Sequence, residues 1–364
     1  MISRSSVQDL IASYDPGAIK VGTLGSHSAL DIADGAHDEG FRTVVVCQQG
    51  REGPYQSFNR IVDEVLVLPK FSEVVSASVQ EELRRRSVIF VPHRAFTTYV
   101  GYDAIEEAFM VPLFGNRALL RAEERSAAKN QYHLLAKAGI RMPKVVRKES
   151  IDGPVMVKVQ EAKRRVERAF FIANSSDDFE KKAGEKIKSG LITEEDLRSA
   201  VIEEYVIGTY FNFNYFYSPL SEQTEFLGID RRLQTNLHDF VSLPAREQLE
   251  IEVEVRNIEI GHTPATIRES MLGKVLDMGE RFVRAVRQEY GVGPIGPFAL
   301  QGAVTVDLDI VIFDVSPRVP GSPVLATTSP YSKYYHGEIV GTGRRIAMEV
   351  RRGVKEGRLR ELVT

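Results

Sequence analysis

The sequence predicts an α/β fold for the first part of the chain and an α+β fold for the remainder. In residues 1–109, short runs rich in β-branched residues alternate with amphipathic helical patterns, which is typical of a parallel sheet with helices on both faces. Further along, polar and aromatic residues alternate with period two, as they do in antiparallel strands. The 364 residues, 43% of them hydrophobic, can bury a large core and form two or three domains.

The first part is expected to contain five strands and two main helices. Gly40 stops the first helix, and Ser78 is the expected N-cap of the second. Parallel sheets bind ligands outside the carboxyl ends of their strands, so the turn at 25–28 and Pro92-His93 are expected to face a ligand. The expected strands are 19–24, 43–47, 64–68, 87–91 and 110–114, and the helices are 29–39 and 78–86.

The second part is expected to begin near Pro143 and to hold mainly antiparallel sheet. A charged helix over 121–139 precedes it and ends at Ala138-Gly139. The remaining expected elements are a strand at 155–159 with a hairpin partner at 169–173, a helix at 177–190, strands at 200–206 and 210–217, a helix at 266–290, and a strand pair at 298–304 and 308–315.

Composition excludes several classes of protein. The net charge of −3 argues against a general nucleic-acid binder. The single cysteine, Cys47, excludes a disulfide framework and a thiolate zinc site. No stretch of 18 apolar residues and no apolar signal region is present, so we expect a cytoplasmic protein with no membrane partner.

The turn Gly25-Ser26-His27-Ser28 links the first expected strand to the first expected helix. Backbone N–H groups at a helix N-terminus attract anions, and small residues permit a phosphate to approach closely. The alternative is an ordinary turn with serine as the N-cap. Asp31 stands in the first helical turn and would not help an anion to bind.

A second constellation pairs Lys158 with the run Glu203-Glu204-Tyr205-Val206. A lysine among apolar strand residues needs a partner, and a nucleotide phosphate would satisfy it. The alternative is an exposed lysine beside a charged edge strand. The loop 160–169 after Lys158 has no glycine and four basic residues. It is either a solvated charged turn or a set of cations that reach over a triphosphate.

A third constellation follows the last expected strand, where Asp314, Ser316 and Arg318 recur with period two. They share one face of the strand, and with Gln301 on the neighbouring strand they could hold a hard cation and a phosphate. A solvated row of ion pairs is the alternative. No G-x-G-x-x-G follows the first strand, which disfavours a dinucleotide-dependent dehydrogenase.

Taken together, the order of these elements resembles the ATP-grasp superfamily, and more closely the archaeal 5-formaminoimidazole-4-carboxamide ribonucleotide synthetase family. The resemblance runs from about residue 19 to residue 349. It implies a Rossmann-like domain at 1–122, an ATP-grasp small (lid) subdomain at 123–208 and a large subdomain at 209–364. The phrases that carry it are TLGSHS at 23–28, GREGPY at 50–55, VPLFGNR at 111–117, IEEYV at 202–206, FYSPL at 216–220, IRES at 267–270 and IGPFALQ at 295–301.

This resemblance implies an ATP- and formate-dependent ligase that formylates 5-aminoimidazole-4-carboxamide ribonucleotide through formyl phosphate. It also implies Mg²⁺, with Mn²⁺ as a substitute, and a homo-oligomer. The implied catalytic residues are Arg268 and Arg318. The implied substrate-binding residues are Gly25, Ser26, His27, Ser28, Ala95 and His262. The implied ATP-binding residues are Lys158, Glu203, Glu204, Tyr205, Val206 and Glu225. The implied metal ligands are Gln301, Asp314 and Ser316.

The sequence also departs from the family pattern. Ala95 stands where a serine is usual, His262 where an asparagine is usual, and Asp314 where a glutamate is usual. Two prolines stiffen the segment 319–324. Two alternatives therefore stay open beside the formylating ligase. One is a paralogue that ligates a different carboxylate or amine, and the other is a protein that binds a nucleotide without turnover.

Overall fold

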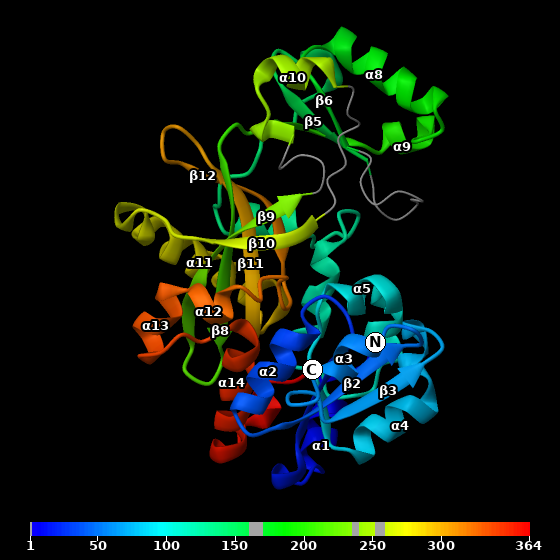
Figure 1. Ribbon diagram of the computed structural model, residues 1–364, viewed down its shortest axis with the longest axis vertical. Helices are drawn as coiled ribbons and strands as arrows, with labels where there is room; N and C mark the ends of the chain where they lie inside the picture. The colour runs from blue at the N-terminus through cyan, green and yellow to red at the C-terminus, as the bar shows by residue number, and fades with distance from the viewer. Residues whose placement is uncertain (1, 160–169, 235–239, 252–258) are drawn as a thin grey trace.

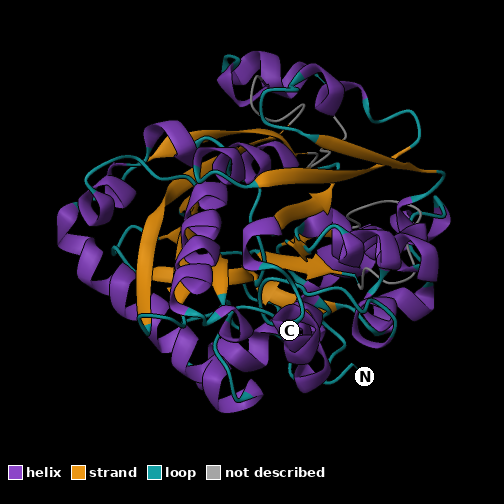
Figure 2. Cartoon of the chain, turned by 90° about the horizontal axis from the view of Figure 1, so that it is seen from below, coloured by secondary structure: helices purple, strands orange, loops and turns teal. Residues whose placement is uncertain are grey.

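The computed structural model describes residues 2–159, 170–234, 240–251 and 259–364, and it contains one parallel and two antiparallel sheets (Figure 1). The order of these sheets along the chain confirms the predicted sequence of an α/β part and an α+β part. Seen from below, the strands occupy the middle of the molecule and most helices lie outside them (Figure 2). Among the described residues, no helix has the length and apolar character needed to cross a membrane.

The parallel sheet has the strand order β3-β2-β1-β4, and four of the five strands predicted for this region are confirmed. Its strands are β1 (Lys20–Leu24), β2 (Arg42–Gln48), β3 (Glu64–Leu68) and β4 (Val88–Phe90). The helices of this part are α1 (Arg4–Ala12), α2 (Ala29–Asp38), α3 (Gly53–Ser57), α4 (Ala77–Arg85), α5 (Arg94–Val100) and α6 (Tyr102–Glu107).

Two details of this part were predicted wrongly. The stretch 110–114 is no strand, because only Leu113 pairs with β4, as an isolated parallel bridge to Phe90. Pro112 has no N–H to donate, and the guanidinium of Arg117 binds the Val111 carbonyl at 3.1 Å. Helix α4 begins one residue earlier than expected, so Ser76 and not Ser78 is its N-cap.

The single helix predicted over 121–139 is also wrong. The structure has a 3₁₀ helix at Arg117–Glu123 and a separate helix α7 at Gln131–Lys137. The reason lies in Asn130, whose side chain accepts hydrogen bonds from the backbone N–H groups of Tyr132 and His133. An asparagine in this role starts a helix and does not continue one.

The small antiparallel sheet has the order β6-β5-β7. Its strands are β5 (Val155–Lys158), β6 (Phe170–Ala173) and β7 (Val201–Glu204), and helices α8 (Ser176–Lys188) and α9 (Glu194–Arg198) follow β6. The predicted hairpin of β5 with β6 is confirmed. The small sheet lies at the end of the molecule opposite α1 (Figure 1).

The large antiparallel sheet has the order β10-β9-β8-β11-β12. Strands β8 (Thr209–Ser218), β11 (Gly296–Val304) and β12 (Ile310–Ser316) were predicted, whereas β9 (Gln223–Gln234) and β10 (Glu259–Ala265) were not. Helix α11 (Glu269–Tyr290) covers one face, where the rings of Tyr215, Phe282 and Phe298 stack. The remaining helices are α10 (Ala245–Glu250), α12 (Leu325–Thr328), α13 (Pro330–His336) and α14 (Thr342–Glu356).

Helix α14, near the end of the chain, packs on helix α2 of the parallel sheet. The two helices touch through backbone at Gly35 and Gly343, where a Cβ on Gly343 would stand 1.9 Å from the carbonyl oxygen of Asp31. Asp31 also accepts a hydrogen bond from the Gly343 N–H at 3.2 Å. The contact therefore fixes α2, and with it the turn 25–28 that precedes α2.

We predict that Gly343→Ala destabilises the protein by about 2 kcal/mol, because the added methyl group meets backbone that cannot rotate away. Urea unfolding followed by circular dichroism measures the change. Gly273→Ala in α11 is the matched control, since a Cβ there meets no atom within 4 Å. The control is expected to be neutral or stabilising by up to about 1 kcal/mol. Equal losses in both variants would contradict the importance of the α2–α14 contact.

Candidate active site

The candidate site lies where the carboxyl ends of the parallel strands meet the segment that leaves β12. Val319 N–H donates to the Pro92 carbonyl at 3.3 Å, and His93 and Val319 form an isolated parallel bridge. The Ser28 hydroxyl donates to the Pro320 carbonyl at 2.9 Å. These contacts bring the turn 25–28 of the first part against the segment 319–323 of the second.

Two histidines from the parallel sheet stack at this junction. The ring centroids of His27 and His93 are 5.7 Å apart and the rings are nearly parallel. His93 Nδ1 accepts from the Ala95 N–H, so its Nε2 donates to the Leu24 carbonyl at 2.9 Å. Burial, and then the nearby Arg318 cation, lower the pKa of His27 to about 2. Both rings are therefore neutral at physiological pH.

The small residues of the turn 25–28 have packing roles as well as a place at the site. A Cβ on Gly25 would meet Cys47 Sγ at 2.5 Å and a ring carbon of Tyr55 at 2.9 Å. Close packing against β2 and α3 therefore requires glycine here. Asp31 of α2 turns toward α14 through Gly343, so its carboxylate is engaged by α14.

Lys158 of β5 is buried and paired. Its Nζ lies 2.5 Å from Glu203 Oε2, and the hydroxyl of Tyr132 donates to Glu203 Oε1 at 2.7 Å. The ammonium also lies 5.9 Å from the centroid of the Phe313 ring, which places it beside β12 of the large sheet. The charged loop 160–169 lies outside the described residues.

Of the other expected ATP-binding residues, Glu204 ends β7, and Tyr205 and Val206 follow it. The Glu204 carboxylate accepts from the Lys144 N–H at 3.3 Å, and Tyr205 N–H donates to the Pro154 carbonyl. Val206 is buried with Ala303 and Val311 of the large sheet. This run therefore spans the gap between the small and the large sheet.

Gln301 and Asp314 stand directly opposite each other on β11 and β12. Gln301 Nε2 donates to Ser316 Oγ at 3.3 Å, so the amide oxygen keeps its full capacity to accept. Burial raises the pKa of Asp314, but Arg125, Arg232 and Lys158 outweigh it and hold that pKa below its ordinary value. The result is an ionised carboxylate surrounded by cations.

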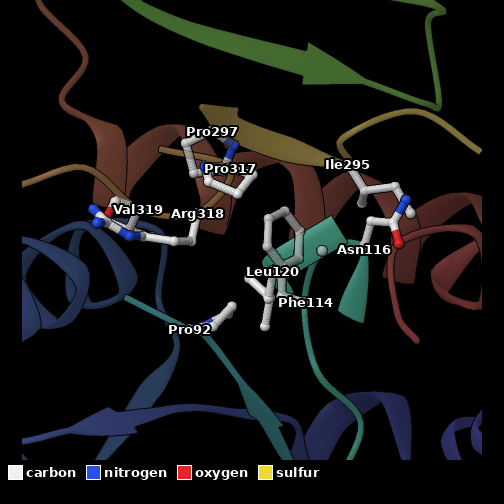
Figure 3. A pocket seen from close by; sticks show the side chains of 10 residues that line it. Pro92, Phe114, Asn116, Leu120, Ile295, Pro297, Pro317, Arg318 and Val319 are labelled. Carbon is white, nitrogen blue, oxygen red and sulfur yellow. The ribbon is translucent and has the colours of Figure 1, made fainter. Parts of the chain in front are cut away.

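Arg318 is buried two residues beyond the end of β12. Its Nε lies 3.0 Å from Glu123 Oε1, and Arg94 donates to the other oxygen of the same carboxylate at 2.9 Å. Arg318 also lines a small pocket, with room for about one water molecule, between the two parts of the chain. Figure 3 shows Pro92, Phe114 and Leu120 from the first part facing Pro297 and Pro317 from the second.

His262 of β10 lies between two carboxylates. Its Nδ1 is 2.5 Å from Asp230 Oδ2 and its Nε2 is 2.8 Å from Glu259 Oε1. Burial lowers the pKa of His262, but the two hydrogen bonds outweigh burial and raise that pKa to about 9. Asn212 and Asn214 of β8 also donate to Asp230, each at 2.7 Å.

Comparison with known proteins gives matches over the full length of the chain. Residues 21–146 match a family described as a protein of unknown function (DUF1246), and residues 178–364 match a domain of unknown function (DUF1297). A relative from Methanopyrus kandleri is named 5-formaminoimidazole-4-carboxamide-1-(beta)-D-ribofuranosyl 5'-monophosphate synthetase. It is 44% identical over 365 residues and both chains are covered completely. A relative of the same name from Methanothermobacter thermautotrophicus is 42% identical, over 100% of this chain and 99% of the relative.

The chain belongs to this synthetase family.

Solved structures agree with this assignment. The crystal structure of the IMP biosynthesis protein PurP from Thermococcus kodakaraensis superposes with a TM-score of 0.72 at 30% identity, over 94% of this chain and all of PurP. An ADP complex of the N5-carboxyaminoimidazole ribonucleotide synthetase PurK has a TM-score of 0.58 at 14% identity, over 89% of this chain and 77% of PurK, and so shares the fold. The predicted family and ATP-grasp fold are confirmed, and the synthetase is an ATP-dependent ligase.

The structure brings most of the expected residues of this synthetase into one region but gives Glu225 other partners. The Glu225 carboxylate is bound by the Arg345 guanidinium at 2.7 and 2.8 Å and by His336 at 3.1 Å. These partners belong to α13 and α14, and the α14 residue Arg345 also stacks on Phe216. Glu225 therefore anchors helices on the large sheet.

The expected catalytic residue Arg268 is exposed at the N-cap of α11. Ala95 is buried, and its N–H donates to His93 Nδ1. Its methyl group can offer a ligand no hydrogen bond. Arg318, in contrast, is buried and paired with Glu123, and His27 stacks on His93.

Sequence reasoning missed three residues that shape this region. They are Glu123, which bridges two arginines, Tyr132, which binds Glu203, and Glu259, which binds His262. His93 was expected to face a ligand, and its ring stacks on His27. One signal for the polar cluster around His262 was available. Asn212 and Asn214 alternate with aromatic residues in β8, and two buried amides on one face require a polar partner, which is Asp230.

We predict that the stabilising effect of His262 depends on pH. The folded-state pKa of about 9 lies above the ordinary value near 6.5, so the stability contributed by the imidazolium is complete below about pH 6.5 and disappears as pH rises through about 9. The difference in urea midpoint between wild type and His262→Gln should therefore be largest at pH 6 and smallest at pH 9.5. A difference that grows with pH would refute this assignment of charge.

Proposed function

We propose that this synthetase is an ATP- and formate-dependent ligase that formylates 5-aminoimidazole-4-carboxamide ribonucleotide in purine biosynthesis. The observation that carries the proposal is the match, over the whole chain, to relatives named as synthetases of the formamido product. The geometry supports it, because a cationic region around Asp314 adjoins a neutral histidine pair at His27 and His93. Such a site suits two anionic substrates on one side and a heterocycle on the other.

The proposed reaction has two balanced steps. A formate oxygen attacks the γ-phosphorus of ATP, the bond to the bridging oxygen breaks, and ADP leaves with formyl phosphate formed. The amine nitrogen of the ribonucleotide then attacks the formyl carbon, the C–O bond to phosphate breaks, and the amine releases one proton. Both steps bring anions together, so cationic groups must neutralise charge.

The proposed roles follow from the positions of the side chains. Lys158 and the run Glu203 to Val206 bind ATP in the gap between the small and the large sheet. Arg318 binds the phosphoryl group, and Arg268 assists from the helix terminus. The turn 25–28 with His27 binds the ribonucleotide. We further propose the domain limits 1–122, 123–208 and 209–364, a homo-oligomer, and a cytoplasmic location.

A magnesium ion fits the residues present. Gln301, Asp314 and Ser316 offer an amide, a carboxylate and a hydroxyl oxygen, which are hard donors, and Mg²⁺ is usually bound by one or two carboxylates together with substrate phosphates. These three residues would hold it, with Mn²⁺ as a substitute. The ion would supply charge neutralisation for the γ-phosphate.

A second candidate is a ligase of the same fold that uses a different carboxylate or amine. Ala95 and His262 favour it, because neither offers the ribonucleotide a free polar group. A third candidate is a protein that binds a nucleotide without turnover, and the experiments below test it as well.

We predict that ADP is formed at a rate above background only when ATP, formate and the aminoimidazole ribonucleotide are all present. A coupled ADP assay with each substrate omitted in turn measures this. Stimulation by another small acid or amine in place of formate or the ribonucleotide would favour the second candidate. Thermal stabilisation by nucleotide without any ADP would favour binding alone.

We predict that Asp314→Asn lowers the metal-dependent kcat at least about a hundredfold, because the only charged oxygen of the proposed ligand set is lost. Binding of the ribonucleotide, measured by calorimetry, should stay within about twofold of wild type. Asp309→Asn is the matched control, since this exposed aspartate pairs with Arg141 on the surface. Unchanged kcat in Asp314→Asn would remove Asp314 from the site.

A further inference from the structure

Asp230, His262 and Glu259 form a hydrogen-bonded cluster. The proposed function gives no role to the Glu259 carboxylate of this cluster. Both ring nitrogens of His262 face carboxylate oxygens, at 2.5 and 2.8 Å, so both carry protons and both donate. A ligand could reach neither N–H without breaking an ion pair. His262 therefore holds the two carboxylates in place and makes no contact of its own with a substrate.

The two carboxylates differ in what they can still accept. Asp230 is fully buried and already accepts from Asn212, Asn214 and His262. The side chain of Glu259 is 28% exposed, and His262 and Arg232 hold one oxygen each, Arg232 at 2.7 Å. Each carboxylate oxygen can accept two hydrogen bonds. Glu259 is thus the member of the cluster that can also bind a ligand.

Glu259 faces His27 across Gly321. The point where a Cβ on Gly321 would stand is 2.9 Å from His27 Nε2 and 3.6 Å from Glu259 Oε1. His27 Nδ1 lies 2.7 Å from Ser28 Oγ, whose hydroxyl donates to the Pro320 carbonyl. The Ser28 oxygen must then accept from His27, so Nδ1 carries the ring proton and Nε2 is an acceptor.

His27 Nε2 and Glu259 Oε1 therefore flank the same side of Gly321, each within 3.6 Å of the place where a side chain would begin. Two acceptors cannot satisfy each other, so the group between them must be a donor of N–H or O–H bonds. The charged groups around them are Arg232 on β9, His262 on β10 and Arg318 after β12, and Asp230 on β9 binds the other nitrogen of His262. His262 and Arg232 keep Glu259 ionised.

We propose that Glu259 is a specificity-determining residue, which together with His27 accepts hydrogen bonds from the N–H groups of the acceptor nucleotide, and that His262 positions Glu259. This inference rests on the proposed function for the identity of the nucleotide. An amine or a primary amide offers the paired N–H donors that this position requires. A carboxylate at the same place would face Glu259 and be repelled.

Isothermal calorimetry with 5-aminoimidazole-4-carboxamide ribonucleotide tests the proposal. Glu259→Gln is expected to weaken ribonucleotide binding about tenfold or more, since a hydrogen bond to a charged group is lost, while the Kd for ATP stays within about twofold. Gly321→Ala places a methyl group 2.8 Å from the His27 ring, between that ring and Glu259, and is expected to abolish ribonucleotide binding with ATP binding retained. Glu338→Gln, at an exposed ion pair with Arg344, is the matched control and should bind both ligands as wild type does.

His262→Gln separates positioning from direct contact. A positioning role predicts a rise in KM for the ribonucleotide with a smaller change in kcat, and a loss of the pH dependence of KM around pH 9, where His262 titrates in the folded protein. A merely structural role would lower the thermal midpoint and leave the KM of the folded fraction and its pH profile as in wild type, and would overturn the positioning assignment.

Wild-type binding of the ribonucleotide that persists unchanged in both Glu259→Gln and Gly321→Ala would overturn this inference alone. Failure of the wild-type protein to bind the ribonucleotide would overturn the proposed function and this inference together. Ribonucleotide binding that depends on Glu259, without formate-dependent ADP formation, would overturn the proposed function. It would still support His27 and Glu259 as the hydrogen-bond acceptors of the ribonucleotide.

Discussion

The pairing of the backbone that leaves β12 with the backbone that leaves β4 is the contact on which the candidate site depends. Val319 and Pro92 make the hydrogen bond, and Ser28 extends the contact to Pro320. His27 follows β1 of the parallel sheet and Gly321 follows β12 of the large sheet. Without this contact nothing would bring these two residues together. The α2–α14 packing, which has no room for even one methyl group, holds the same two parts together from behind.

Electrostatics divide the junction into two regions with opposite demands. Around Asp314, cations from three different parts of the chain keep a half-buried carboxylate ionised. Around His27, the loss of hydration and the nearby Arg318 cation keep the rings of His27 and His93 neutral. An acyl-phosphate ligase needs both properties side by side, since the phosphates need positive charge and the heterocycle needs a neutral, directional set of acceptors. The 319–323 segment connects the two regions.

Local patterns predicted the elements whose residues follow one regular pattern along their whole length. The β-branched runs became β1 to β4, and the polar–aromatic alternation became β8 with its asparagines turned toward Asp230. Prediction failed where one side chain interrupts a pattern. Asn130 starts a new helix within a helical pattern, and Pro112 prevents a strand. Strand β9 was missed because it contains Gly228, in a conformation with φ of 148°, beside a bulge.

The sequence by itself determined the family, the order of the sheets and the residue types of the site, because these depend on local periodicity and on phrases that recur in a fixed order. Only the tertiary structure decided which side chains meet. His27 and His262 have no common spacing in the chain, and their surroundings depend on hydrogen bonds between residues far apart in sequence, such as Ser28 with Pro320 and His262 with Asp230. Such partners also decide which histidine is charged, since a ring between two carboxylates gains a proton and a ring buried beside an arginine loses one.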